Sequence, residues 1–230
     1  MKRLKVLIGC EHSGVVRDSF LKAGHDAWSC DLLDDISGHP NHIKGNVLDI
    51  LDRGWNLAIF HPPCTDLAVS GARYFAEKRA DGRQQAAIDF FMKLANADIP
   101  LICIENPVSV MSTQWRKPDQ IIQPWMFGHD ASKRTCLWLK GLPKLEHGEI
   151  IPPEGWMLAE NEFRWKLAPV RRKVDGYRFW NYGVLVRPLW ANQTPSGQNK
   201  LGPSPDRWKK RAETYQGIAD QMAAQWGKLV

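Results

Sequence analysis

The sequence contains the stretch Leu57-Ala-Ile-Phe-His-Pro-Pro-Cys-Thr-Asp-Leu-Ala-Val-Ser-Gly71, in which an apolar strand runs directly into a rigid turn. Proline fixes φ and has no N–H, so His61-Pro62-Pro63 cannot continue a central strand. The turn therefore holds a single thiol, Cys64, at the carboxyl end of that strand. A thiol held in this way is a candidate nucleophile. The alternative is a small buried hydrophobic residue, which the polar surroundings of Cys64 do not favour.

The residues before this stretch predict the start of a parallel sheet. Residues 4–10 have the apolar character of a buried strand, and residues 15–23 predict a helix that Gly24 ends. Residues 25–30 predict a second strand, closed by Asp31. A strand, helix and strand within about 30 residues form the unit that builds parallel sheets.

The later apolar runs extend this pattern over the rest of the chain. They predict strands at residues 42–47, 55–60, 101–104 and 136–139, and helices at residues 76–97 and 204–226. We expect the intervening residues 108–132 to be rich in loops. The predicted fold class is α/β, with one domain made of residues 1–140 and 204–230 and a small irregular accessory lobe at residues 141–203.

Three reactive residues follow strands of this predicted sheet. Asp31 follows the second strand, Cys64 follows the strand at 55–60, and Glu105 follows the strand at 101–104. Ligands of open α/β sheets bind at the carboxyl edge of the strands, so we expect these residues on one rim. The glycine turn after the first strand and the acid after the second suit a nucleotide cofactor, whose ribose hydroxyls a carboxylate can accept.

The pairing of a thiol with a carboxyl group indicates a particular reaction. A thiolate adds to electron-poor carbon, and a carboxyl group can bond to or protonate a ring nitrogen. Attack at C6 of a pyrimidine makes C5 nucleophilic. A lysine or arginine before the strand at 136–139, either Lys133 or Arg134, could complete the polar pocket.

The cysteines and histidines favour neither disulfides nor a metal. The five cysteines are odd in number and widely scattered, which is not a disulfide framework. His39-x-x-His42 and His61-x-x-Cys64 have metal-like spacing, but no second convincing pair accompanies either, so we expect no metal site. No apolar run is long enough to span a bilayer, and the N-terminal apolar run is too short for a signal segment. We therefore expect a cytoplasmic protein with no membrane partner.

The net charge of +6 and the isoelectric point near 9.1 are unevenly distributed. Residues 164–211 hold many lysines and arginines, including Arg171, Arg172 and Lys173, interleaved with aromatic residues. Basic and aromatic side chains in alternation suit nucleic acid, and these three residues are the candidate contacts. The alternative is a solvated basic face over a small aromatic core.

Several of these stretches carry a family resemblance. Pro62-Pro63-Cys64, followed by Ser70-Gly71, resembles the Pro-Cys catalytic loop of the cytosine-C5 DNA methyltransferases. Glu105-Asn106-Pro107 resembles the Glu-Asn-Val of that family. Weaker matches are His12-Ser13-Gly14, Asp31, Gly45-Asn46 and residues 214–223. The resemblance covers residues 4–139 and 204–226, and the compact length is similar to that of small phage and prophage proteins of this type.

The resemblance implies a Rossmann-like sheet that uses S-adenosyl-L-methionine and acts on cytosine in DNA. Cys64 would attack C6 from a loop shaped by Pro63, and Glu105, beside Asn106, would contact the ring N3 and the exocyclic amine. The implied cofactor-binding residues are His12, Ser13, Gly14, Asp31, Asn46, Pro62, Tyr215 and Ile218. A duplex substrate would require flipping of the target cytosine out of the base stack, whereas a single strand would not. We expect a monomer.

The sequence departs from the family pattern at several places, and other functions stay open. Thr65 stands where the family has Gln, Asn46 where it has Asp, and His12 where it has an aromatic residue. One alternative is an amino-methyltransferase, because His61-Pro-Pro-Cys64 resembles an Asp-Pro-Pro-Tyr loop. Others are a modifier of a free pyrimidine nucleotide and a catalytically silent nucleic-acid-binding protein.

Overall fold

The computed structural model divides the chain into two compact units. The first comprises Met1–Ile122, Arg134–Glu146 and Ala212–Val230, and the second comprises Gln123–Lys133 and His147–Arg211. The structure describes residues 2–151, 156–159, 162–165, 172–174, 178–181, 184–186, 190–194, 199–204, 207 and 212–229, with backbone alone between 156 and 186.

The first unit is an α/β domain built on a seven-stranded mixed sheet, which confirms the α/β class of the predicted fold. The strand order is β3-β2-β1-β4-β5-β7-β6. The strands from β3 to β5 are parallel, whereas β7 is antiparallel to both β5 and β6, an arrangement compatible with a Rossmann-like fold. The strands are β1 (Lys5–Gly9), β2 (Asp26–Asp31), β3 (His42–Lys44), β4 (Leu57–Phe60), β5 (Leu101–Pro107), β6 (Gln120–Ile122) and β7 (Thr135–Lys140).

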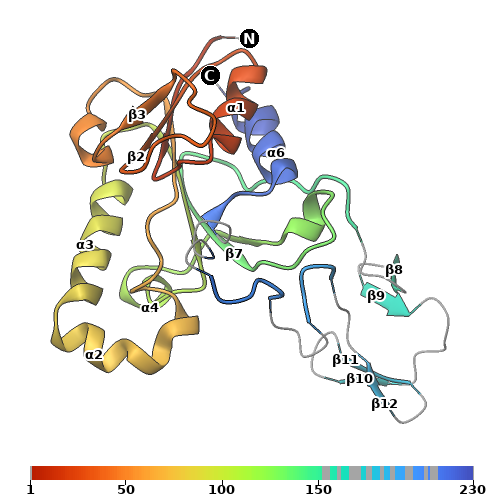
Figure 1. Cartoon of the computed structure of the whole chain (residues 1–230). Helices are drawn as coiled ribbons and strands as arrows, with labels where there is room; N and C mark the ends of the chain where they lie inside the picture. The colour runs from red at the N-terminus through yellow and green to blue at the C-terminus, as the bar shows by residue number, and fades with distance from the viewer. Residues whose placement is uncertain are drawn as a thin grey trace. The chain divides into compact units, whose positions relative to one another are not determined.

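Helices cover both faces of this sheet (Figure 1). On one face α1 and α6 lie side by side, joined by a hydrogen bond of 2.9 Å from Ser19 Oγ to Asp220 Oδ1. On the other face lies α3, whose Phe91 and Leu94 are fully buried. The described helices of this unit are α1 (Val15–Lys22), α2 (Phe75–Ala80), α3 (Arg83–Ala95), α4 (Met111–Gln114) and α6 (Gln216–Trp226), with 3-10 turns η1 (Val47–Ile50) and η2 (Val69–Tyr74).

The alternation of side chains along each strand divides the core between the two faces. A cluster of buried residues packs between the sheet and α3: Leu7, Ala58, Phe60, Ile102, Ile104, Phe91 and Leu94. The intervening strand residues, such as Ile8, Ile59 and Cys103, are also fully buried and point to the α1–α6 face. Burial on both faces explains why the central strands are continuous apolar runs.

Two local predictions are wrong. The helix expected at residues 76–97 is two helices, because Gly82 has φ of +82° between α2 and α3, a conformation that favours glycine. Residues 108–132 are not all loop, since Gln120–Ile122 forms β6 at the edge of the sheet.

The helix expected at residues 204–226 is described as α6 from Gln216 onward. Residues 205–206 and 208–211 of that prediction lie outside the described residues.

In the second unit, the described strands are short and antiparallel. β8 (Trp156–Ala159) pairs with β9 (Glu162–Trp165), and β11 (Arg178–Asn181) pairs with both β10 (Arg172–Val174) and β12 (Val184–Val186). The region that we expected to be irregular therefore contains two small sheets.

The two segments of this second unit are joined by side-chain contacts. The side chain of Asn192 bonds both the N–H and the carbonyl of Ser132, each at 2.9 Å. Trp125, in η3 (Pro124–Phe127), stacks on Trp190 with ring centroids 6.0 Å apart. These contacts hold residues 190–194 against residues 123–133 although they are about 60 residues apart in the sequence.

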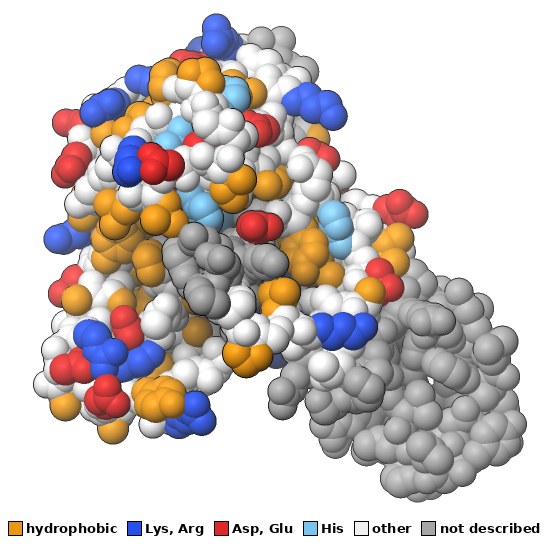
Figure 2. Space-filling view, in the orientation of Figure 1, with side chains coloured by type: hydrophobic (Ala, Val, Ile, Leu, Met, Phe, Trp, Pro, Cys, Tyr) orange, Lys and Arg blue, Asp and Glu red, His pale blue; other side chains and the backbone are white. Residues whose placement is uncertain are grey.

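In the part of the chain that the structure describes, no helix is both long enough and apolar enough to cross a membrane. On the face shown in Figure 2, the described lysines and arginines are interspersed with acidic side chains and do not form one basic patch.

Candidate active site

The turn after β4 holds Cys64 outside the sheet. Pro62 is buried, Pro63 is exposed and Cys64 is half-buried. The carbonyl of Cys64 accepts hydrogen bonds from the N–H groups of Leu67 at 3.1 Å and Ala68 at 2.9 Å, which closes a tight turn directly behind the thiol. The backbone of Cys64 is therefore part of the turn, and its side chain is not part of the strand core.

Two neighbouring elements brace this turn. The ammonium group of Lys78, which is only 6% exposed, bonds the carbonyl of Thr65 and forms an ion pair with Asp66 at 3.2 Å. The segment after the turn pairs with the segment after β5, through Val69 N to Val108 O and Val110 N to Leu67 O, both at 3.0 Å. The loop that carries Cys64 is thus tied to α2 and to the end of β5.

Glu105 and Asn106 lie within β5 and point to opposite faces of the sheet. Their backbones pair with Leu137 and Cys136 of the antiparallel β7, which extends β5 beyond the last residue that β4 pairs, Ile104. Successive side chains of a strand alternate between faces. Asn106 therefore shares the α3 face with Ile104, and Glu105 points to the α1–α6 face. The two adjacent residues have separate partners for this reason.

Asn106 connects β5 to the turn that carries the thiol. Its Nδ2 donates to the carbonyl of Pro62 at 2.9 Å, and its side chain is almost fully buried. The register explains this bond. Phe60 of β4 lies opposite Ile104, so Pro62, two residues after Phe60, comes next to Asn106, two residues after Ile104. Asn106 thereby holds the position of the residue two places before Cys64.

Glu105 faces a histidine that the sequence analysis left without a role. Nδ1 of His61 lies 2.9 Å from Oε2 of Glu105, and both side chains are about one-tenth exposed, at 11% and 9%. The hydroxyl of Thr214, just before α6, donates to the same oxygen at 3.4 Å. Three segments distant in sequence therefore meet at one carboxyl oxygen.

The other cysteines are poor nucleophiles because they are held in their neutral form. Burial raises the pKa of Cys30 and of Cys136 to about 11, and it also raises the pKa values of Cys10 and Cys103 well above the usual value of a thiol. The thiolate is the reactive form of cysteine. These four thiols are therefore unreactive at neutral pH, and position alone makes Cys64 the candidate.

The turn after β1 is built around a buried carboxyl group, Glu11. It accepts the N–H of Val16 at 2.8 Å and the hydroxyl of Ser13 at 3.4 Å, so it satisfies a donor at the start of α1. Burial raises the pKa of Glu11, while the charge of His61 and the bonds from the backbone of α1 lower it. His12 is buried, and Gly14 adopts φ of +75° as the residue before α1.

Beneath this turn lies an arginine that is entirely buried, Arg17. Its Nη1 bonds Asp35 Oδ1 at 2.7 Å and Ser29 Oγ at 2.9 Å, and its Nε bonds the exposed Asp18 at 2.8 Å. A side chain at Gly14 would collide with this guanidinium, so Arg17 accounts for the glycine. The requirement for Gly14 is therefore internal to the protein.

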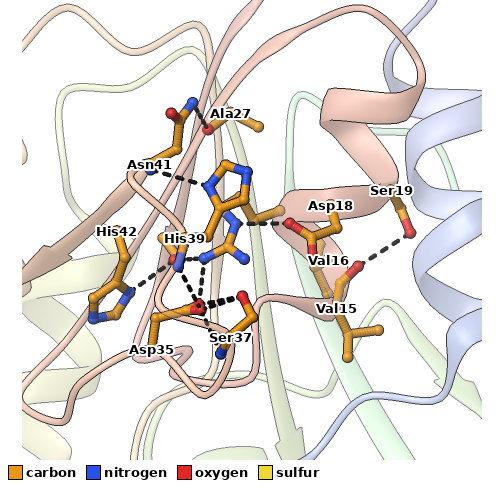
Figure 3. A network of polar contacts seen from close by, with 12 residues as sticks. Val15, Val16, Asp18, Ser19, Ala27, Asp35, Ser37, His39, Asn41 and His42 are labelled. Atoms are coloured by element: carbon orange, nitrogen blue, oxygen red, sulfur yellow. Dashed lines mark hydrogen bonds and ion pairs between the residues drawn. The ribbon is translucent and has the colours of Figure 1, made fainter.

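Asp35 extends the network into the loop between β2 and β3 (Figure 3). Its carboxylate also accepts the N–H and the hydroxyl of Ser37, at 3.1 and 2.8 Å. Burial by itself would raise the pKa of Asp35, but the bonds from Arg17 and Ser37 hold it well below its usual range. Below the loop, His42 lies 2.9 Å from both Ser29 Oγ and the carbonyl of Leu33. The loop is thus anchored by polar contacts.

Asp31 and Asn46 both bond backbone groups near them. Oδ1 of Asp31 accepts the N–H of Leu33 at 2.9 Å, and among the described residues its Oδ2 has no hydrogen-bond partner. Oδ1 of the exposed Asn46 accepts the N–H of Leu48 at 3.1 Å and so caps η1. Leu32, directly after Asp31, is 72% exposed. The end of β2 therefore presents an available carboxylate oxygen, Oδ2 of Asp31, beside the exposed apolar side chain of Leu32.

Two of the expected cofactor residues belong to α6. Tyr215 caps this helix, and its carbonyl accepts the N–H groups of Ile218 and Ala219 at 3.0 and 3.2 Å. Ile218 is 4% exposed and contributes to the hydrophobic core. Thr214, which precedes both, is the residue of this segment that reaches Glu105.

The remaining predicted residues are not brought to this site by any contact described here. Arg134 is exposed in the first unit, and Lys133, in the second, donates its N–H to Gln123 Oε1 at 2.9 Å. Arg172 and Lys173 form part of β10, of which only the backbone is described, and Arg171 lies outside the described residues. In the described ranges no three His, Cys, Asp or Glu side chains are grouped as metal ligands.

Sequence reasoning missed the roles of His61, Glu11 and Arg17. The register of β4 and β5 places His61 beside Glu105, although 44 residues separate them in the sequence. A signal for Glu11 was present, because it lies four residues before the first residue of α1 and acidic groups stabilise the start of a helix. No local pattern marks Arg17, whose burial depends on Asp35.

The comparisons with known proteins add no family to this description. No protein-family model matches the chain, and no curated protein matches it. The candidate site therefore stands on its geometry and on the resemblance of its short motifs.

Proposed function

We propose that this protein is an S-adenosylmethionine-dependent methyltransferase that acts on C5 of cytosine in DNA through a covalent bond between Cys64 and C6. The observation that carries the proposal is the junction of β4 and β5. There Asn106 holds the Pro62 carbonyl of the nucleophile's turn, and Glu105 points to the opposite face, next to His61.

The residues at the β1 and β2 ends fit the proposed cofactor. An adenosine group presents ribose hydroxyls and a flat apolar ring. Asp31 offers Oδ2 as an acceptor for the hydroxyls, and the exposed Leu32 offers an apolar surface for the ring. Glu11, Ser13 and Gly14 shape the turn through which a ligand approaches the backbone. When bound, S-adenosylmethionine supplies an electrophilic methyl group.

The chain's own residues would prepare the pyrimidine ring to accept that methyl group. Cys64 Sγ forms a bond to C6, and the electron pair displaced from the C5–C6 double bond makes C5 nucleophilic while N3 takes a proton from Glu105. After C5 has received the methyl group, its proton passes to a base, the thiolate is expelled, and N3 returns its proton to Glu105, which restores the aromatic ring and the starting enzyme. The atoms balance without any oxidant or reductant.

The contact made by His61 also supports this proposal over the amino-methyltransferase. In the alternative, the first residue of the Xaa-Pro-Pro loop holds the amino group of the substrate. Here that residue is His61, and its side chain is directed at Glu105. The cysteine at the end of the loop likewise has a role only in C5 transfer.

The first experiment measures transfer of a radiolabelled methyl group to duplex DNA, single-stranded DNA, RNA and free dCMP in parallel. We expect DNA to be labelled, and Cys64→Ser to reduce the rate at least ~10³-fold, because the hydroxyl is a far weaker nucleophile. Cys103→Ala is the matched control: it removes a buried thiol from β5 and retains transfer.

A second readout follows the covalent bond itself. DNA containing 5-fluorocytosine should trap an adduct on the wild-type chain, detectable by mass, because fluorine cannot leave C5 as a proton does. Full methyl transfer by Cys64→Ser would exclude the mechanism. A labelled product without a trapped adduct favours the amino-methyltransferase, and absence of S-adenosylhomocysteine binding in calorimetry favours the silent nucleic-acid-binding protein.

A further inference from the structure

His61 lies between groups from several segments of the first unit. Its Nδ1 is 2.9 Å from Glu105 Oε2 on β5, and Thr214, before α6, donates to that same oxygen. Its charge also acts on Glu11, the buried carboxyl group in the turn after β1, whose pKa burial raises and His61 lowers. On the loop that follows His61, the carboxylate of Asp66 forms an ion pair with Lys78 of α2.

The direction of the His61–Glu105 bond follows from the chemistry of the two groups. An ionised carboxylate can only accept hydrogen bonds, so Nδ1 of His61 carries the hydrogen when Glu105 is charged. The same bond persists after Glu105 gains a proton only if that proton sits on Oε1. Because Thr214 also donates to Oε2, two donors keep the acidic proton off that oxygen.

We propose that His61 is a positioning residue for Glu105: it fixes the carboxyl rotamer through Oε2 and so directs the acidic proton on Oε1 toward N3 of the pyrimidine. This inference rests on the proposed function and deepens it. His61 itself transfers no proton. Its burial supports the role, because a side chain about one-tenth exposed at a rigid Pro-Pro turn has few other orientations.

The test is a set of three substitutions that differ in where they place a donor. His61→Asn puts an amide nitrogen near the position of Nδ1, His61→Gln puts it near Nε2, and His61→Ala removes it. We expect His61→Ala and His61→Gln to lower kcat ~100-fold with KM changed less than about twofold, since the misplaced carboxyl affects the transition state. His61→Asn should recover most of the lost kcat.

A double-mutant cycle separates positioning from a merely structural role. Once Glu105→Gln has removed the acidic proton, adding His61→Ala should lower kcat little further. The two reductions in kcat should therefore not multiply. Thermal unfolding of each variant, including the milder His61→Asn, reports whether the fold is intact.

The outcomes distinguish this inference from the function on which it rests. If the wild-type chain is active, any of three results would overturn the assignment of His61 alone. These are an equally active His61→Ala, recovery of kcat by His61→Gln instead of His61→Asn, and losses that multiply in the double-mutant cycle. A wild-type chain that transfers no methyl group and traps no adduct would overturn the proposed function, and this role of His61 with it.

Discussion

The two halves of the sheet edge use polar side chains in different ways. At the β1–β2 half, Glu11 bonds the start of α1 and Arg17 is enclosed by Asp35 and Ser29. At the β4–β5 half, His61 and Glu105 bond each other from adjacent strand ends. The first set bonds helix ends and loops, and in the second set one side chain orients the other.

The comparison teaches that the place of a polar residue at this edge of the sheet does not by itself define its role. A polar residue there can shape the backbone that a ligand meets, or it can act on the ligand itself. The two roles differ in the number of backbone groups with which the side chain forms hydrogen bonds. A capping side chain already uses its hydrogen-bonding atoms on the backbone, so fewer remain for a ligand. Three substitutions at the β1–β2 half test this division, in order of decreasing effect.

The largest effect should come from Arg17→Met. Removing the guanidinium leaves the carboxylate of Asp35 buried without its cation, and breaking a buried pair in this way costs about 3–5 kcal/mol. Denaturant unfolding should show this loss in the free energy of unfolding. Adding Asp35→Asn should restore part of it, because the buried charge is then gone.

Arg3→Met is the matched control for this variant. Arg3 is 71% exposed on its side chain and 4.0 Å from Asp26, so its removal should change the free energy of unfolding by less than about 0.5 kcal/mol. Equal stability of Arg17→Met and the wild type would show that the buried cation does not anchor the loop.

A smaller effect, about 1–2 kcal/mol, should follow Glu11→Ala, which removes the acceptor at the start of α1. Glu11→Gln keeps an acceptor and should be nearly as stable as the wild type at low pH. Because burial raises the pKa of Glu11 above 4.5, its stabilising contribution is complete below that pH and is lost as the pH rises.

The stability of Glu11→Gln relative to the wild type should therefore increase as the pH rises above about 4.5 and then level off. Urea unfolding of both chains across this pH range measures the difference. A difference that stays constant would show that folding does not shift the pKa of Glu11, and a difference that falls with pH would show that the folded chain stabilises its anion. Either result would contradict the prediction.

The smallest effect should come from Asn46→Ala, at about 1 kcal/mol, because an exposed cap of a short 3-10 turn is lost. Asn46→Asp keeps the acceptor and should retain that stability. If Asn46 acts only as a cap, the affinity for S-adenosylhomocysteine measured by calorimetry should be the same in both variants. A loss of affinity confined to Asn46→Ala would move Asn46 from the structural set to the ligand-binding set.

Much of the fold could be predicted because its signals are local. The first strand, helix and second strand lie within one residue of the predicted bounds at each end. Apolar runs mark the strands, and Gly24 marks the end of the helix. The local sequence pattern does not reveal the edge strand Gln120–Ile122. This strand has only three residues, and it forms because it pairs with β7. Gly82 likewise interrupts a run whose apolar spacing predicts one continuous helix.

The sequence by itself identified three reactive residues near the carboxyl ends of strands: Asp31, Cys64 and Glu105. It placed Asp31 and Glu105 after their strands, whereas β2 ends at Asp31 and β5 continues to Pro107. That inference needs only the strand ends, and proline and glycine mark them through their backbone restrictions. The tertiary structure alone decided which of these residues meet. The register that sets Phe60 opposite Ile104 brings His61 to Glu105 and Pro62 to Asn106 across 44 residues. Register is set by the packing of both strands into the core, and no local stretch encodes it.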